Sequence, residues 1–213
     1  MGTDRVGPSG YRHAPGVVPM SLRPSGVVEP LPLVIVRTGQ APVRQGEPCT
    51  GLWRVQSGLL AATVVNPQGR ELWIDVMGAG ELVGDVPGDV AAWTWRALRP
   101  CRLVAARGDV EREALVARTA RLTTAAMDLA WQDVPNRIER RLLDLAERFG
   151  HPGPVGTTIP IVLRHEDLAA LAGTTRESAT RAVRALTSAG RITRAGRGRY
   201  VVPTPPLRPS SGG

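Results

Sequence analysis

The chain has 213 residues, 42% of them hydrophobic, and its 27 basic and 19 acidic residues give a formal net charge of +8 at pH 7. This length and hydrophobic content suit one large or two small globular domains. Every basic residue is Arg, and the positive charge favours a polyanionic partner such as DNA. No apolar run approaches the roughly 18 residues of a membrane span, so we expect a cytoplasmic protein with no membrane partner.

The residue types that bind metals are scarce and scattered. Cys49 and Cys101 are far apart and have no His near them in sequence, so neither a zinc site nor an iron–sulfur site is expected. We therefore expect no metal and no other cofactor. A lone buried thiol is more often inert packing than a redox sensor, and this is the role we expect for both.

The composition divides the chain into five segments. Residues 1–30 and 204–213 are rich in Pro and Gly without a hydrophobic period, so both are expected to be disordered tails. Between them we expect a β domain at 31–107, a long helix at 108–132 and a helical domain at 133–203. The expected fold class is α+β.

The β domain is indicated by short apolar runs separated by turn residues. Runs such as "LPLVIV", "RELWIDV" and "CRLVAA" are each bounded by Gly, Pro, Asn or Asp, and "NPQGRE" is a probable hairpin loop. This spacing predicts an antiparallel, jelly-roll-like β-roll.

The segment that follows predicts a helix that pairs with a second copy. Between Gly108 and Trp131 there is no Gly or Pro, and small or apolar residues recur at alternating spacings of four and three. This is the pattern of a coiled-coil seam. The predicted seam consists of Leu115, Thr119, Leu122, Ala126 and Leu129. The alternative is a helix that packs only on its own domain.

The C-terminal domain has the pattern of a winged helix-turn-helix. Asp133 is a predicted helix cap, the helix ends at Gly150, and a Gly- and Pro-rich loop is followed by a predicted strand, "TIPIVL". Two shorter helices then flank a turn at Gly173, with Thr175 as the cap of the second, although Arg164 is a poor cap for the first. The last part, "GRITRAGRGRYVV", predicts two strands around a basic tip, the wing.

Three charged residues near the start of the second short helix suit the reading of DNA bases. Arg176, Glu177 and Arg181 lie within an arc of roughly 140° on an ideal helix. An Arg fork matches guanine O6 and N7, and a carboxylate accepts from cytosine N4. The alternative is an ordinary solvated face with a Glu177–Arg181 pair.

Other polar residues on this helix and on the wing are candidate contacts to the DNA backbone. Such contacts position a protein on the duplex without reading its sequence. The set comprises Thr175, Thr180, Arg184, Arg194, Arg197 and Arg199. The alternative for the wing is a hairpin that is merely soluble.

Two stretches resemble a known family. The span "LRHEDLAALAGTTRESATRAVRALTSAGRI" is similar to the DNA-binding signature of the Crp/Fnr superfamily of bacterial transcription regulators, and "VRQGEPCTGLWRVQSGLLAATVVNPQGREL" with "GAGELVGDV" resembles its cyclic-nucleotide-binding roll. The resemblance covers about Val36 to Val202. It implies a homodimer on a pseudo-palindromic promoter site, with half-sites related to TGTGA and RNA polymerase as a partner. It also implies that Arg176, Glu177 and Arg181 read bases.

The chain departs from the superfamily where cyclic AMP would bind. Members that bind it carry an acidic residue and then an Arg-Ser or Arg-Thr pair that holds the phosphate. Asp85 can replace the acidic residue, but Ala91 and Ala92 stand in place of the pair, so we expect DNA binding to be independent of cyclic AMP.

The roll leaves two further alternatives open. Trp93 and Trp95 either fill the vacant pocket as core or, with Asp85, line a site for a flat apolar effector. A cupin-like metalloenzyme is disfavoured because His13, His151 and His165 all lie outside the roll. We therefore expect no enzymatic activity.

Overall fold

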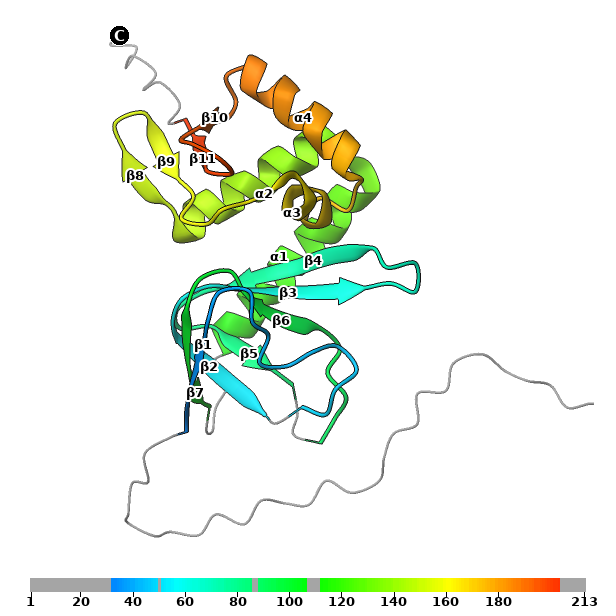
Figure 1. The fold of residues 1–213 in the computed structure, drawn as a ribbon, viewed down its shortest axis with the longest axis vertical. Coiled ribbons are helices and arrows are strands. Elements are labelled where there is room, and N and C mark those ends of the chain that lie inside the picture. Colours follow the sequence, from blue (N-terminus) through cyan, green and yellow to red (C-terminus); the bar gives the residue numbers. More distant parts are fainter. Residues whose placement is uncertain (1–31, 50, 86–87, 107–111, 204–213) are drawn as a thin grey trace, which may run out of the picture. The chain divides into compact units, whose positions relative to one another are not determined.

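The structure is a computed structural model, and it describes residues 32–49, 51–85, 88–106 and 112–203. The tails expected at 1–30 and 204–213 lie outside the described residues, as does the start of the long helix expected from residue 108. The fold is α+β, with an antiparallel β-roll, a long helix and a C-terminal winged helix-turn-helix, as predicted (Figure 1).

Within the described part of the roll, seven strands form two antiparallel sheets with the orders β1-β7-β2-β5 and β4-β3-β6. The strands are β1 (Leu33–Val36), β2 (Leu52–Ser57), β3 (Leu60–Val65), β4 (Glu71–Met77), β5 (Leu82–Gly84), β6 (Thr94–Ala97) and β7 (Cys101–Ala105). The predicted hairpin loop joins β3 to β4, where the Asn66 side chain accepts hydrogen bonds from the backbone N–H groups of Gln68 and Arg70. The hairpin loop was therefore predicted correctly.

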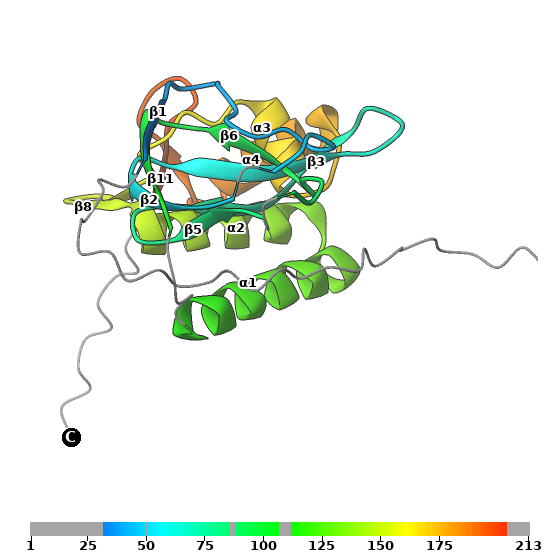
Figure 2. The same cartoon turned by 90° about the horizontal axis from the view of Figure 1, so that it is seen from below.

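Two helices follow the roll in the chain, and the second belongs to the C-terminal domain. They are α1 (Arg112–Trp131) and α2 (Val134–Phe149), and Figure 2 shows them side by side. Asp133 caps α2 by accepting from Asn136 N at 2.9 Å, and Gly150 ends it, both as predicted. An ion pair between Asp128 and Arg140, 2.9 Å apart, joins the two helices.

The remaining elements form the winged helix-turn-helix. They are β8 (His151–Gly153), β9 (Gly156–Thr158), α3 (His165–Leu171), α4 (Arg176–Ser188), β10 (Thr193–Arg194) and β11 (Tyr200–Val202). The wing sheet has the order β10-β11-β9-β8.

The strand predicted at residues 158–163 was wrong. A β8–β9 hairpin takes the place of the predicted loop, and the following residues have no strand assignment. Pro160 has no N–H to donate to a ladder. The segment is anchored in the core of the C-terminal domain by three buried side chains, those of Ile159, Ile161 and Leu163. Burial of every second residue is also the pattern of a half-buried strand, so the two arrangements look alike in the sequence.

The β3–β4 hairpin belongs to two cores at once. Leu60 and Ala62 face the core of the roll, whereas Ala61 and Trp73 pack in a second core together with residues of α2, α3 and α4. Trp73 is only 1% exposed. Burial on both faces of this hairpin fastens the DNA-binding domain to the roll.

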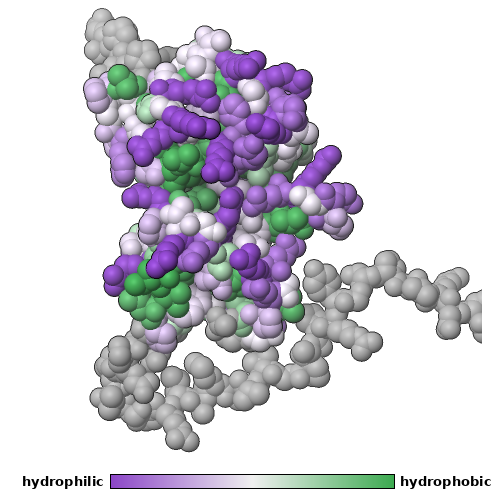
Figure 3. All heavy atoms as spheres, in the orientation of Figure 1, coloured by the Kyte–Doolittle hydropathy of each residue, from purple (hydrophilic) through white to green (hydrophobic). Residues whose placement is uncertain are grey.

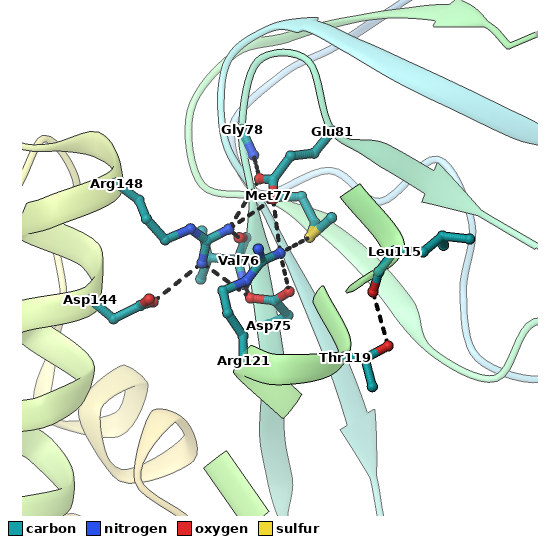
Figure 4. A network of polar contacts seen from close by, with 10 residues as sticks. All are labelled: Asp75, Val76, Met77, Gly78, Glu81, Leu115, Thr119, Arg121, Asp144 and Arg148. Carbon is teal, nitrogen blue, oxygen red and sulfur yellow. Dashed lines mark hydrogen bonds and ion pairs between the residues drawn. The ribbon is translucent and has the colours of Figure 1, made fainter. Parts of the chain in front are cut away.

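A buried cluster of charges reinforces this junction (Figure 4). Asp75 on β4, whose side chain is 3% exposed, accepts from Arg121 of α1 at 2.9 Å and from Arg148 of α2 at 3.2 Å. Glu81 pairs with the same two arginines at 2.8 and 3.1 Å. We call these four residues the interdomain clasp, because they join the roll, α1 and α2.

The clasp is balanced in charge and rich in hydrogen bonds. Arg148 also donates to the Val76 carbonyl at 2.6 Å and pairs with Asp144 at 3.2 Å. Burial disfavours the charge of Arg121, but the hydrogen bond and charge of Asp75, with Glu81 and Asp144, outweigh it and raise the pKa of Arg121. Buried charges need such pairing, since an unpaired charge is costly to desolvate.

Candidate DNA interface

The turn between α3 and α4 has a conformation that only glycine meets easily. Gly173 has φ of +60°, and a Cβ at this position would lie 2.7 Å from Leu129 Cδ2. Thr175 then caps α4 by accepting from Ser178 N at 3.2 Å. Sequence reasoning predicted both features, and they set the angle at which α4 leaves the turn.

Arg164 occupies the N-cap position of helix α3. Its side chain does not cap the helix, because a guanidinium group carries no hydrogen-bond acceptor. Asp167 compensates in part by accepting from the Arg164 backbone N–H at 2.8 Å. The same carboxylate group lies 3.4 Å from Arg96 of the roll. The weak start of this helix is therefore supported by its own Asp167 and, from outside the helix, by Arg96.

The three predicted base-reading residues lie on the exposed side of α4, over which Figure 3 shows mostly hydrophilic surface. Arg176 Nε is 2.9 Å from Glu166 Oε1, and both side chains are more than half exposed. Arg181 donates to Ser178 Oγ at 3.1 Å. Glu177 forms no ion pair with Arg181, so the alternative of an internal Glu177–Arg181 pair is not realised among the described residues.

Of the six predicted backbone-contact residues, Thr175 caps α4, and the other five divide into two groups. Arg184, Arg197 and Arg199 are exposed side chains on α4 and on the wing. Thr180 and Arg194 instead meet at His165, whose Nδ1 lies 2.8 Å from Thr180 Oγ1 and whose Nε2 lies 3.1 Å from Arg194 Nη2. Sequence reasoning did not assign His165 to this site, although its place beside the helix-turn-helix motif was a usable signal.

The predicted dimer seam lies on α1, and Figure 2 shows that the side of α1 turned away from the strands and from α2 faces no other labelled element. Leu115, Thr119, Ala126 and Leu129 are exposed and Leu122 is half-buried, while Leu129 also lies against Gly173 of its own chain. Sequence reasoning missed part of this apolar surface. Exposed Val116 and Met127 add to it, whereas Trp131, which is 73% exposed, lies nearly opposite the seam on an ideal helix.

The predicted effector residues of the roll lie in different environments. Trp95 is completely buried in the roll core, and Trp93 is half-buried. The guanidinium carbon of Arg118, from α1, lies 5.5 Å from the centroid of each ring. The backbone N–H of Asp85 donates a hydrogen bond to Cys49 Sγ at 3.2 Å.

Several buried polar atoms of this region have no hydrogen-bond partner among the described residues. They are Asp85 Oδ2, Trp93 Nε1, Trp95 Nε1 and Arg118 Nη2. Such groups are uncommon in folded proteins and call for an explanation at each position. Ala91 is buried and Ala92 is exposed; these are the two residues that the sequence analysis predicted to stand in place of the Arg and hydroxyl pair.

The part of the chain that the structure describes holds no group of three or more His, Cys, Asp and Glu residues able to bind a metal ion. Burial raises the pKa of Cys101 to about 11, so this thiol stays protonated near neutral pH. Within the same residues, no helix has the length and apolar character of a membrane span.

Comparison with known proteins matches both halves of the chain. A cyclic nucleotide-binding domain model matches residues 33–116, and a Crp-like helix-turn-helix domain model matches residues 136–206. The chain belongs to the Crp/Fnr superfamily of transcription regulators. This family consists of regulators, which are not enzymes, and that finding disfavours the cupin-like alternative.

The relatives within this superfamily are moderately similar. Regulatory protein CysR of Synechococcus elongatus is 29% identical over 183 residues, which cover 81% of this chain and 85% of CysR. The CRP-like cAMP-activated global transcriptional regulator of Mycobacterium tuberculosis is 28% identical over 162 residues, which cover 68% and 72% of the two chains.

Solved structures of Crp/Fnr regulators have the same fold. The c-di-GMP responsive global regulator CLP of Xanthomonas campestris superposes with a TM-score of 0.68 and 25% identity, over 82% of this chain and 95% of CLP. A CRP/FNR-family regulator from Thermus thermophilus gives a TM-score of 0.67 at 22% identity, over 81% and 94%. The names of these relatives refer to two different nucleotide effectors, cAMP and c-di-GMP, so family membership does not identify the effector of this chain.

Proposed function

We propose that this protein is a sequence-specific transcription regulator that binds a pseudo-palindromic promoter site as a homodimer. The observation that carries the proposal is the exposed edge of Arg176, Glu177 and Arg181 on a capped, rigidly seated α4. A helix of this kind enters the major groove with its N-terminal residues toward the base edges. Contact with RNA polymerase is part of the proposal and rests on the family alone.

The charge pattern of α4 favours base reading over simple phosphate binding. Glu177 has no ion-pair partner in the described chain, and a carboxylate directed at DNA is repelled by phosphates unless it accepts from a base such as cytosine. Among the described residues, Arg176 and Arg181 are held only by surface contacts to Glu166 and Ser178. Surface contacts of this kind are weak, so the two side chains can give them up and bind guanine at little cost in free energy.

The dimer is supported by an unusual distribution of charge on α1. From Ala114 to Trp131 the charged residues are Arg118, Arg121 and Asp128, and each contacts its own chain. The outer side of α1 is consequently uncharged and carries exposed Leu115, Val116 and Met127. Exposed apolar surface that continues along a helix is typical of an interaction site.

Thr119 is the polar residue of the predicted seam, and its hydroxyl group is compatible with burial in a dimer. Thr119 Oγ1 donates to the Leu115 carbonyl at 2.9 Å (Figure 4), so its hydroxyl is already satisfied within the helix. A second α1 can therefore cover Thr119 without stranding a polar group. A two-fold arrangement of α1 helices would place two α4 helices for two half-sites.

We further propose that DNA binding does not need cyclic AMP. Ala91 and Ala92 offer no charge-assisted hydrogen bond to a cyclic phosphate. A ligand shifts a conformational equilibrium only by its different affinity for the two states, so one that does not bind shifts nothing. Titration of the apo-protein with its selected DNA site, with and without millimolar cyclic AMP, should give the same Kd. A gain beyond about tenfold would contradict the proposal.

A second candidate function is gating by an effector bound in the roll. The observation that favours it is the set of buried, partnerless polar atoms on Trp93, Trp95 and Arg118, which a flat ligand with hydrogen-bond acceptors would satisfy. Arg118 lies on α1, so such a ligand would contact the proposed dimer helix directly. Ligand screening by quenching of Trp fluorescence, repeated with Arg118→Met, tests this candidate.

The experiment that tests the main proposal begins with selection of binding sites from random-sequence DNA. Arg176→Ala and Arg181→Ala should each lose about 1–3 kcal/mol on the selected site and little on scrambled DNA, because an Arg fork discriminates between bases. Arg102→Ala, an exposed Arg on β7 of the roll, is the matched control and should bind normally. Equal losses on both DNAs would remove the two residues from base reading.

A further inference from the structure

His165 joins the recognition helix to the wing through a chain of hydrogen bonds with a defined direction. Arg194 can only donate, so Nε2 of His165 accepts from it at 3.1 Å. Nδ1 then carries the proton of the neutral ring and donates to Thr180 Oγ1 at 2.8 Å. The Thr180 hydroxyl in turn donates to the Arg176 carbonyl at 2.8 Å. In the free protein this arrangement holds His165 as a neutral imidazole.

The groove around this chain is suited to an anion. Its walls carry cationic and hydroxyl groups from α4 and the wing but no carboxylate. The lining residues are His165, Thr180, Val183, Arg184, Thr187, Ser188 and Arg194. A phosphate oxygen needs donors of this kind, and an Arg in such a groove binds it in a charge-assisted manner.

The charged groups that face His165 on balance favour its neutral form. They are Arg194 from β10, Arg176 and Arg184 from α4, and Glu166 from its own helix. Partial burial, followed by the charge of Arg194, lowers the pKa of His165, and Arg176 and Arg184 act in the same direction. Glu166 opposes them, but its carboxylate is paired with Arg176 at 2.9 Å.

We propose that His165 is a DNA-backbone contact that takes up one proton per protomer when a phosphate enters this groove. The inference rests on the proposed DNA-binding function. The phosphate accepts a hydrogen bond from Arg194, and Arg194 thereby breaks its hydrogen bond to Nε2 of the imidazole. A proton from solvent then binds Nε2, and the new N–H donates to the phosphate. The Nδ1–H bond to Thr180 is retained throughout, so the ring stays in place as its charge changes.

The direction of the pH effect follows from this sequence of contacts. An anion beside the ring favours its charged form, so the pKa of His165 is higher in the complex than in the free protein. Protonation of His165 therefore strengthens DNA binding. This gain in affinity is fully present at a pH below the pKa of the free protein, and it is lost as the pH rises through the pKa of the complex. Each unit of difference between the two pKa values corresponds to about a tenfold change in affinity per protomer.

The test is a series of fluorescence-anisotropy titrations of the full chain with its selected DNA, from pH 5.5 to 8.5 at constant ionic strength. The wild type should bind more tightly as pH falls, by at least about tenfold over the series. His165→Gln should remove most of this slope while binding at pH 8.5 stays within a few-fold of wild type. His151→Gln, on the β8–β9 hairpin, is the control and should keep the slope.

The outcomes separate the inference from the proposed function. A His165→Gln variant with the pH slope of the wild type overturns the role of His165, whereas a wild type that does not prefer its selected DNA at any pH overturns the proposed function. Imidazole ¹⁵N spectra give an independent readout. His165 should be the neutral Nδ1–H form in the free protein and doubly protonated in the complex at pH 6.5, and a neutral ring in the complex would contradict the inference.

Discussion

Replacing Arg148 by Met tests whether the interdomain clasp stabilises the molecule. The change keeps an unbranched apolar side chain but removes the guanidinium that bonds Asp75, Glu81, Asp144 and the Val76 carbonyl. Removal of one partner from a buried ion pair typically costs about 3–5 kcal/mol. Arg121 still pairs with both Asp75 and Glu81, so neither carboxylate is stranded, and we expect a loss near the lower end, about 3 kcal/mol.

The measurement is urea unfolding followed by circular dichroism at a fixed protein concentration, because dimerisation would otherwise contribute to the apparent stability. Arg102→Met is the control. Arg102 lies on β7 and its exposed side chain donates to Gln56 Oε1 at 3.2 Å, so its loss should cost less than about 1 kcal/mol. If the two variants unfold at the same urea concentration, the clasp does not stabilise the junction.

Three other predictions concern separate parts of the molecule. Ala126→Glu, at an exposed seam position, should convert the dimer to monomer in analytical ultracentrifugation, whereas Ala117→Glu, on the opposite side of α1, should not. Arg197→Ala at the wing tip should weaken binding to all DNA sequences alike and reduce the slope of log K against log salt by about one; an unchanged slope would remove it from the phosphate contacts. Native Cys101 should resist alkylation at pH 8, because burial raises its pKa to about 11, and the same burial should lower stability as pH rises from about 9 to about 11. Rapid labelling in the folded protein would show that this thiol is accessible.

Local signals in the sequence predicted much of the DNA-binding domain. Asp133, Gly173 and Thr175 act within four residues of their own positions, through capping and turn conformation, so each could be identified without knowledge of the fold. The wrong prediction of a strand at residues 158–163 also arose from reliance on a local signal. Alternating burial of Ile159, Ile161 and Leu163 is a local pattern, and two different tertiary arrangements produce it.

Contacts between distant segments could not be predicted in this way. Asp75 meets Arg121 and Arg148 across 46 and 73 positions of the chain. Nothing in the sequence around any one of them indicates its partners. His165 joins Thr180 and Arg194 by contacts that arise only when the wing folds back on α4. Trp73 shows the same limit, since sequence reasoning placed it in the roll but not at the junction with the DNA-binding domain.

The double-sided burial of the β3–β4 hairpin has a genetic consequence. Ala61 and Ala62 are adjacent and both fully buried, yet one faces the DNA-binding helices and the other faces the interior of the roll. Enlarging Ala61 should shift the seating of α2, while enlarging Ala62 should disturb the roll itself. Mutants recovered for altered promoter occupancy should therefore cluster on alternate residues of this strand, far from any nucleotide that the protein contacts.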